Sequence, residues 1–185
     1  MALKNTTTEF GSLAKALHWL VAIGILALIY LGLEQADMEG GDEKTYIRFI
    51  HASIALGIFV LMTIRIAWRF MNEVPGHPEG MAAWQRMCAT LVHWGLYASV
   101  FVQLTAGFMT VATGGKPLPF FGIFSVPLPV AEDRDAHHFW EEIHEFTWKI
   151  VAILLVVHVV GAFYNHFVLK NDVLRRMTAG VSRDG

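Results

Sequence analysis

The sequence predicts an all-α integral membrane protein, a bundle of four transmembrane helices formed by a single domain over residues 1–185. Composition is the first observation behind this prediction: 55% of the 185 residues are hydrophobic and only 16% are charged, whereas a soluble domain carries about a quarter charged residues. The second observation is that the apolar residues form four long blocks. Each block approaches or exceeds the roughly 20 residues that cross a bilayer. Backbone polar groups must bond internally in hydrocarbon, so each block is expected to be a helix.

The predicted spans cover about residues 14–33, 47–70, 84–112 and 139–168. The first span does not resemble a cleaved signal peptide, because the acidic stretch 34–43 follows it instead of a small-residue cleavage site. Turn signals separate the spans: Gly-Gly at 40–41, Pro-Gly-His-Pro at 75–78, and a long Pro- and Gly-rich connection over 114–129. Four crossings place both chain termini on the same side of the membrane.

The loop charges predict the orientation of this bundle. Of the 14 Lys and Arg residues, nine lie on the side of the termini and of the second connection, and five lie on the opposite side. Cytoplasmic loops carry the excess of Lys and Arg, so both termini are expected in the cytoplasm. The nine are Lys4, Lys15, Arg65, Arg69, Arg86, Lys170, Arg175, Arg176 and Arg183, and the five are Lys44, Arg48, Lys116, Arg134 and Lys149.

Histidines inside the spans are the main functional signal, because ionisable residues in a membrane are functional candidates by default. His144 and His158 are about four turns apart on the fourth helix, so they share a face within roughly 40° and lie about 21 Å apart along the axis. His18 enters on the first helix at the depth of His158. His51 enters on the second helix, from the opposite side, at the depth of His144. The depths therefore predict two pairs, His18 with His158 and His51 with His144.

Each pair can supply two axial imidazoles to one haem iron between the helices. No Cys-x-x-Cys-His sequence is present for covalent haem attachment, and the single cysteine, Cys88, can form no internal disulfide. We therefore expect two haems b held by coordination alone. A lone histidine would more simply bond a backbone carbonyl between helices; the matched depths of four histidines favour ligation.

Basic residues near these depths are candidates for contacts to the haem propionates. Arg65 follows His51 by the same interval that separates His144 from His158, so it lies on the ligand face at the level of His158. A buried guanidinium needs an anion, which a propionate provides. Snorkelling of Arg65 to the headgroups is the alternative. Lys149 is a weaker candidate for a similar role near the His51–His144 haem.

The end of the fourth helix offers polar groups for a quinone, which needs a lipid-accessible cleft with partners for its carbonyls. Asn165, His166 and Lys170 lie there, one to three turns beyond His158. An interfacial cap for the helix explains the same residues. His93, on the third helix, is a second quinone candidate, although a structural role in the core explains it better.

The chain resembles the bacterial cytochrome b561 family over nearly its whole length. The matching segments are LHWLVAIG in the first helix, IHASIALGIFVLMTIRIAWR in the second, PFFGIFSVPLP in the third connection and IHEFTWKIVAILLVVHVVGAFYNHFVLKNDVLRRM at the end. The resemblance implies a four-helix, two-haem protein of the bacterial inner membrane. It also implies that His18, His51, His144 and His158 are the axial ligands.

The resemblance implies electron exchange with quinone, ubiquinone above all, and some family members resemble a superoxide oxidase that passes electrons from superoxide to ubiquinone. The expected activity is that of a quinone-linked oxidoreductase, whose partners are membrane lipid, quinone and either superoxide or a periplasmic redox partner, with no nucleic acid. Superoxide is an anion, and the side opposite the termini carries five basic and eleven acidic residues, a formal charge of minus six. General quinone-linked electron transfer is therefore the firmer expectation.

Three other functions compete with this one. A haem-b membrane anchor would pass electrons between quinone and a soluble redox partner. A di-iron carboxylate protein is suggested by Glu141-x-x-His144, but such a site needs a second Glu-x-x-His, and the sequence has none. A transporter or scaffold would use the histidines structurally or for a transition metal.

Overall fold

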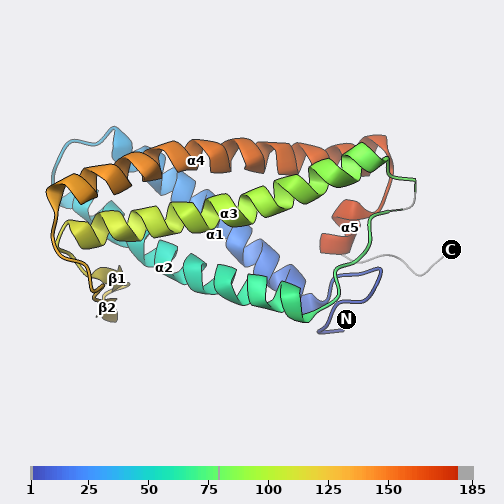
Figure 1. The fold of residues 1–185 in the computed structure, drawn as a ribbon, viewed down its shortest axis with the longest axis horizontal. Coiled ribbons are helices and arrows are strands. Elements are labelled where there is room, and N and C mark those ends of the chain that lie inside the picture. Colours follow the sequence, from blue (N-terminus) through green and yellow to red (C-terminus); the bar gives the residue numbers. More distant parts are fainter. Residues whose placement is uncertain (1, 79, 179–185) are drawn as a thin grey trace.

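The computed structural model describes residues 2–78 and 80–178. Arg183, one of the basic residues in the orientation argument, lies outside the described residues. Four long helices dominate the chain: α1 (Ser12–Ala36), α2 (Asp42–Met71), α3 (Ala83–Thr113) and α4 (Arg134–Phe163) (Figure 1). The all-α four-helix bundle is confirmed, and every predicted span lies inside one of these helices or its continuation.

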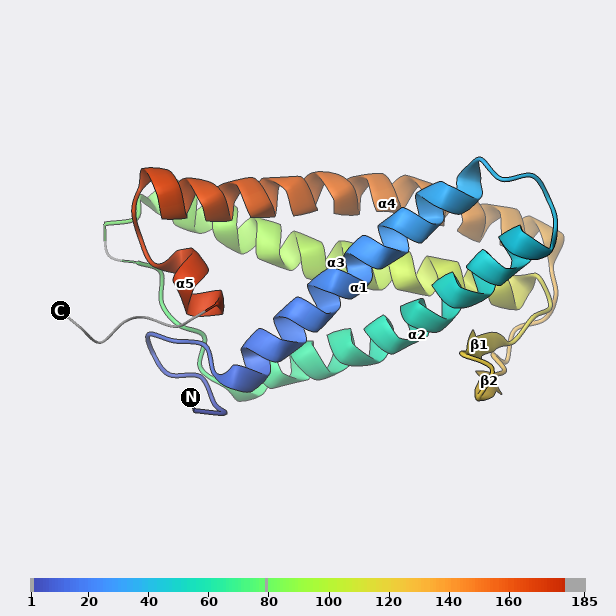
Figure 2. The same ribbon diagram turned by 180° about the vertical axis from the view of Figure 1, so that it is seen from behind.

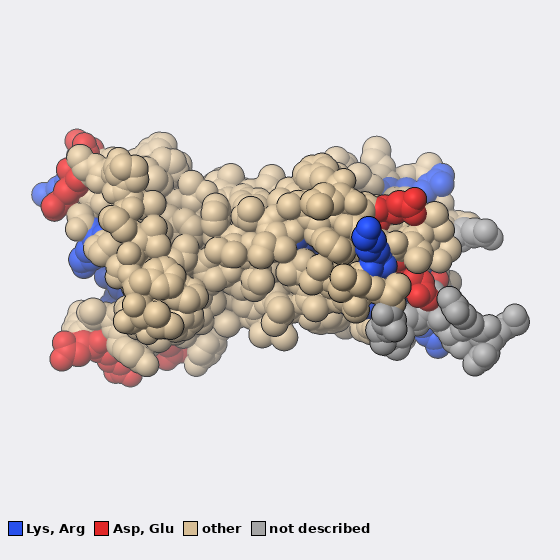
Figure 3. Space-filling view, turned by 90° about the horizontal axis from the view of Figure 1, so that it is seen from below, with Lys and Arg blue, Asp and Glu red and all other residues tan. Residues whose placement is uncertain are grey.

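All four helices are long and apolar enough to cross a membrane, and the fourth candidate span runs from Arg134 to Val168. On the face shown in Figure 3, charged side chains gather at the two ends of the molecule and leave a largely uncharged belt between them. This distribution is what a bilayer requires of a spanning bundle. We call the end of the bundle that holds the start of α1, the short helix after α4 and the α2–α3 connection the terminal end, and the opposite end the far end.

The helices pack as two close antiparallel pairs, α1 with α2 and α3 with α4 (Figures 1 and 2). Gly24 of α1 lies against the side chain of Ile58, and a Cβ at this glycine would collide with that side chain. The buried core runs along the bundle axis between the two pairs. It comprises Val21, Ala55, Ile58, Met62, Tyr97, Val100, Leu104, Phe108, Leu118 and Val151.

The helices extend beyond the predicted spans, and α2 and α4 each begin five residues earlier than predicted. At its start, α4 begins at Arg134, and the side chain of Asp133 accepts a hydrogen bond of 2.8 Å from the backbone N–H of Ala136. At its other end, α4 continues as one π-helical segment, η1 (Tyr164–Val168), and the short helix α5 (Val173–Met177) follows. A π-helical turn is rare and is often found at functional sites.

The short helix α5 folds back at the terminal end of the bundle, between the end of α4 and the start of α1 (Figure 2). The indole N–H of Trp19 on α1 donates to the backbone carbonyl of Met177 at 2.9 Å. Arg176 forms an ion pair of 2.9 Å with Asp172 and donates to the carbonyl of Gly76 at 2.6 Å. These bonds connect the chain after α4 to both α1 and the α2–α3 connection.

The third connection contains a small β-hairpin where the sequence indicated only a Pro- and Gly-rich loop. Strands β1 (Leu118–Phe120) and β2 (Phe124–Val126) pair antiparallel, with Leu118 opposite Val126. The hairpin packs against α2 at the far end, where Leu118 is almost fully buried.

Candidate functional site

The structure brings the four predicted ligand histidines together in two interhelical pairs. The ring centroids of His18 and His158 lie 6.1 Å apart, and those of His51 and His144 lie 6.3 Å apart. Two imidazoles on opposite sides of one metal ion, each bonded at about 2 Å, have centroids roughly 6 Å apart. Direct edge contact between rings gives similar distances. The first pair joins α1 to α4 at the terminal end, and the second joins α2 to α4 at the far end.

The orientation of His144 is set by the backbone of α3. Its ring Nδ1 lies 3.1 Å from the backbone carbonyl of Gln103. A carbonyl only accepts, so Nδ1 is the protonated nitrogen and the lone pair of Nε2 is left for another partner. In this structure Nε2 lies 3.0 Å from the side-chain nitrogen of Gln103. This tautomer is the one that metal-bound histidines commonly adopt when they ligate through Nε2.

A glycine makes this contact with α3 possible. A Cβ placed on Gly107, one turn beyond Gln103, would lie 3.0 Å from Cε1 of His144. The missing side chain therefore lets the imidazole approach the helix backbone. The same arrangement recurs seven residues away on both helices: Nδ1 of His137 lies 2.8 Å from the carbonyl of Thr110, and its ring lies 3.3 Å from the Cβ position of Gly114.

At the terminal end the same helix register places a histidine where the far end has a glycine. His158 lies about four turns beyond His144 on α4, and His93 lies the same number of turns before Gly107 on the antiparallel α3. The ring centroids of His93 and His158 are 5.3 Å apart. His93 is therefore part of the His18–His158 site, and it was only a minor candidate in the sequence.

Two arginines of α2 border this terminal site. Nε of Arg65 donates to the hydroxyl of Tyr97 at 2.9 Å, and its guanidinium lies 5.7 Å from the centroid of that ring. Arg69, one turn later, lies over the rings of Trp94 and Tyr97 at 5.4 and 5.9 Å. Neither arginine forms an ion pair with a described residue, so their charges are available to an anion. The sequence indicated Arg65 but not the role of Arg69 or Tyr97.

Lys149 does not belong to the far site, and that expectation was wrong. Its ammonium group pairs with Glu145 at 3.3 Å, and its side chain is 54% exposed. Lys149 follows His144 by five residues, which is about 140° around the helix. The side chain therefore lies on the outer face of α4, away from the histidine pair.

Unpaired polar atoms mark the far site as a place for a bound group. Nδ1 of His51 and Oε1 of Gln103 are buried, and neither has a hydrogen-bond partner among the described residues. Buried polar groups in proteins are normally paired. The His51–His144 pair, with one unpaired nitrogen of its own and the neighbouring Gln103, thus fits a bound group that supplies a metal between the helices.

The described residues give no support to a di-iron site. Within residues 2–78 and 80–178, no group of three or more His, Cys, Asp or Glu side chains is arranged to hold a metal ion. Glu141 is 57% exposed and lies 3.7 Å from His138. Each histidine pair offers two imidazole donors, which is the number that a bis-histidine haem takes from the protein.

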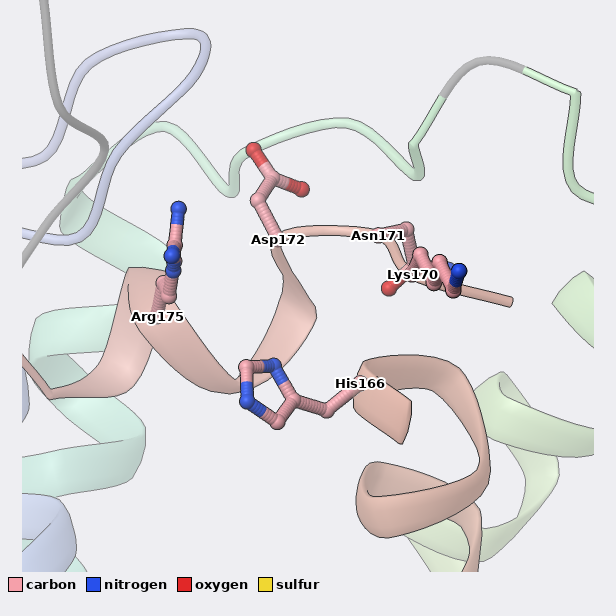
Figure 4. A pocket seen from close by; sticks show the side chains of 5 residues that line it. All are labelled: His166, Lys170, Asn171, Asp172 and Arg175. Carbon is pink, nitrogen blue, oxygen red and sulfur yellow. The ribbon is translucent and has the colours of Figure 1, made fainter. Parts of the chain in front are cut away.

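A pocket at the terminal end includes two of the three quinone candidates (Figure 4). It has a volume of about 220 Å³ and is lined by His166, Lys170, Asn171, Asp172 and Arg175. Asn165 is not among these residues. Its amide donates to the carbonyl of Gly161 at 2.8 Å and its carbonyl oxygen accepts from Asn171 at 2.7 Å, so it caps the end of α4.

Comparison with known proteins agrees with this architecture. The model of the family described as prokaryotic cytochrome b561 matches residues 9–180. Cytochrome b561 homolog 2 of Escherichia coli (strain K12) is 31% identical over 193 aligned positions, which cover 100% of this chain and 98% of that protein. Cytochrome b561 homolog 1 of the same organism is 27% identical over 87% of this chain and 92% of that protein.

A more distant relative is named as an enzyme. The "Probable superoxide oxidase CybB" of Yersinia pestis is 24% identical over 91% of this chain and 95% of that protein. The family match covers nearly the entire bundle, including all four helices and both histidine pairs. The chain therefore belongs to the prokaryotic cytochrome b561 family, and it is a multi-pass bacterial membrane protein that transfers electrons by means of haem b.

Proposed function

We propose that the protein carries electrons across the bacterial inner membrane through two haems b, from a donor at the far end to quinone at the terminal end. Both termini then lie in the cytoplasm. The observation that carries this proposal is the presence of two interhelical histidine pairs that share α4, one at His144 and one at His158. The interval between these two residues separates the sites by about 21 Å along α4, which puts one near each membrane surface.

The chain holds each haem through histidine and helix contacts. His18 and His158 would ligate the haem at the terminal end, and His51 and His144 the haem at the far end. Each haem supplies an iron that gains and loses one electron reversibly. Gln103 fixes the tautomer of His144, and Arg65 and Arg69 offer positive charge to propionates at the terminal site. Electrons would pass between the edges of the two haems, which would lie closer together than the irons, so no aromatic relay would be required.

The pocket beneath α4 supports a quinone site at the terminal end. Lys170 and Arg175 can donate hydrogen bonds to quinone carbonyls, and His166 has a buried Nδ1 that is without a partner among the described residues. The charge of Asp172 is already paired with Arg176. Ubiquinone is the substrate that we assign to this site. Asn165 contributes by capping the helix instead of by binding.

Superoxide is the donor that the name of the Yersinia pestis relative supports. The far end carries a formal charge of minus six, which repels an anion in general. Screening over roughly 8 Å means that only charges near the entrance decide the rate. If residues such as Lys116 or Arg134 form a local basic entrance, superoxide should reduce the far haem quickly. Added salt should then slow this reduction, because it screens the attraction. Slow reduction by superoxide that salt accelerates would mean that the acidic far end repels the anion, and a neutral donor or a basic protein partner would then be the better candidate.

Sealed vesicles test transmembrane transfer directly. The purified protein is reconstituted with ferricyanide trapped inside, and a membrane-impermeant reductant is added outside. We expect ferricyanide to be reduced at a rate proportional to the amount of protein, and we expect a His144→Ala variant to abolish this reduction. A rate equal to that of protein-free vesicles would contradict the proposal.

A further inference from the structure

The β1–β2 hairpin has an uncharged apolar tip between charged flanks. Residues 118–126 (LPFFGIFSV) contain no charge, while Lys116 precedes them and Glu132 begins the acidic stretch before α4. The side chains of Phe121, Ile123 and Phe124 are 46%, 76% and 50% exposed. A loop surrounded by water rarely exposes three neighbouring large apolar side chains, and an exposed apolar patch of this kind is typical of a surface that contacts a membrane or another protein.

The hairpin lies along the side of the bundle instead of projecting beyond it (Figures 1 and 2). The backbone N–H of Phe121 donates to the hydroxyl of Ser53 at 3.0 Å, and the ring of Phe120 lies 3.9 Å from the Cβ position of Gly57. Ser53 is eleven residues into α2, about 16 Å along its axis. The hairpin therefore returns along α2 to the level of His51.

Two backbone N–H groups of the hairpin tip are hydrogen-bonded, that of Phe121 to Ser53 and that of Ile123 to the carbonyl of Phe120. Ser53 is fully buried, and its hydroxyl donates to the carbonyl of Phe49 at 2.8 Å while it accepts from Phe121. Phe121 has a φ of 50°, a left-handed conformation that is uncommon outside glycine, and Gly122 follows with a φ of 74°. An N–H at this turn would be costly to leave unpaired near lipid, and Ser53 satisfies it.

We propose that the tip of the hairpin, Phe121–Phe124, is inserted into the lipid leaflet at the far end of the bundle. Lipid is the partner because the tip is uncharged and continuous with the apolar belt of the helices. The hairpin then covers α2 beside the His51–His144 site and anchors the long α3–α4 connection to the membrane. Ser53 is the positioning residue for this anchor.

Site-directed spin labelling measures the depth of the tip. Cys88 is the single cysteine, so a Cys88→Ser background allows one label per variant, attached at Ile123→Cys. Matched labels at Leu26→Cys, on the exposed apolar face of α1, and at Lys116→Cys, on the charged flank, give the lipid and water references. The protein is reconstituted in phosphatidylethanolamine–phosphatidylglycerol vesicles, and collisions with oxygen and with a water-soluble nickel chelate are compared.

We expect the label at position 123 to favour oxygen over the nickel chelate, as the Leu26 label does. A ratio equal to that of the Lys116 label would place the tip in water and overturn the proposal. Protection from both reagents would also overturn it, because a protein or a second copy of the chain would then cover the tip.

A second variant tests the role of Ser53. Ser53→Ala removes the acceptor for Phe121, and we expect it to broaden the range of depths and raise the mobility of the label at position 123. Ser99→Ala is the matched control, because among the described residues that buried hydroxyl on α3 bonds only within its own helix, to the carbonyl of Leu96. Equal spectra for the Ser53 and Ser99 variants would show that Ser53 does not position the hairpin.

Discussion

The two histidine sites each have one interhelical pair of imidazoles but different surroundings. At the far site, neutral groups of α3 contact His144: Gln103 bonds it twice, and Gly107 leaves space for its ring. At the terminal site, His158 meets His93, and two arginines lie nearby on α2. Positive charge stabilises the reduced form of a haem, which carries one positive charge fewer than the oxidised form. The comparison therefore predicts a higher reduction potential at the terminal site, which favours electron flow from the far end to the terminal end.

The largest expected effect comes from filling the space at Gly107. A Gly107→Val variant would push a side chain into the ring of His144, whose Cε1 lies only 3.0 Å from the Cβ position. Overpacking of this kind costs about 1–3 kcal/mol or displaces the ring. We expect loss of the far haem and retention of the terminal haem, measured by haem content and visible spectra. Gly161→Val is the control, since nothing lies within 4 Å of its Cβ position; equal haem loss in both variants would refute a specific role for Gly107.

A somewhat smaller effect is expected at the pocket of the terminal end. Removing two hydrogen-bond donors in a His166→Ala, Lys170→Ala variant should weaken quinone binding roughly tenfold or more, since each hydrogen bond contributes about 0.5–1.5 kcal/mol. The measurement is quinone reduction by the pre-reduced protein as a function of quinone concentration. An inhibitor-like quinone analogue should perturb only the terminal haem spectrum. Unchanged kinetics, or perturbation of the far haem, would move the quinone site elsewhere.

Arg65 gives a direct test of the electrostatic difference between the sites. An Arg65→Gln variant should lower the potential of the terminal haem by tens of millivolts, where about 59 mV corresponds to tenfold in a one-electron equilibrium. The far haem should keep its potential. Redox titration followed by visible spectroscopy measures both. Lys149→Gln is the control, because its charge is paired with Glu145 on the outer face; a shift as large in this control would show that the effect is not local.

The smallest effect on electron transfer is expected from a substitution in the core between the two histidine sites. Phe59 contacts Phe101 and Phe108 in the core, with ring centroids 5.8 and 5.4 Å apart. Direct transfer between haem edges needs no aromatic relay, so Phe59→Leu should change the inter-haem rate less than about twofold while it costs some stability, about 1 kcal/mol. Flash-induced or rapid-mixing kinetics give the rate. A tenfold slower transfer with intact haem content would assign Phe59 a role in the path.

The helices and the spacing of the histidines could be predicted because they depend on the sequence of single segments. Hydrophobic length identifies a span, and the interval between two histidines on one helix fixes their separation and the face that they share. The partners on α3 could not be predicted in this way. Gln103, Gly107 and Tyr97 matter through the register of α3 against α4 and α2, which no single segment specifies.

Two features of the packing follow from spacings that are visible in the sequence. His137 and His144 are seven residues apart, as are Gly107 and Gly114, and this shared interval follows the antiparallel packing of the two helices. The angle between Lys149 and His144 already excluded Lys149 from the far site. The hairpin could not be predicted, because its tip depends on the hydroxyl of Ser53, 68 residues earlier in the chain.

Haem content and spectra of the four single His→Ala variants test the central claim most directly. The purified wild-type protein should contain two low-spin haems b per chain. His51→Ala and His144→Ala should each remove the same haem, and His18→Ala and His158→Ala should each remove the other. One haem per wild-type chain, or loss of one shared haem in the His18 and His144 variants, would contradict the two-site account.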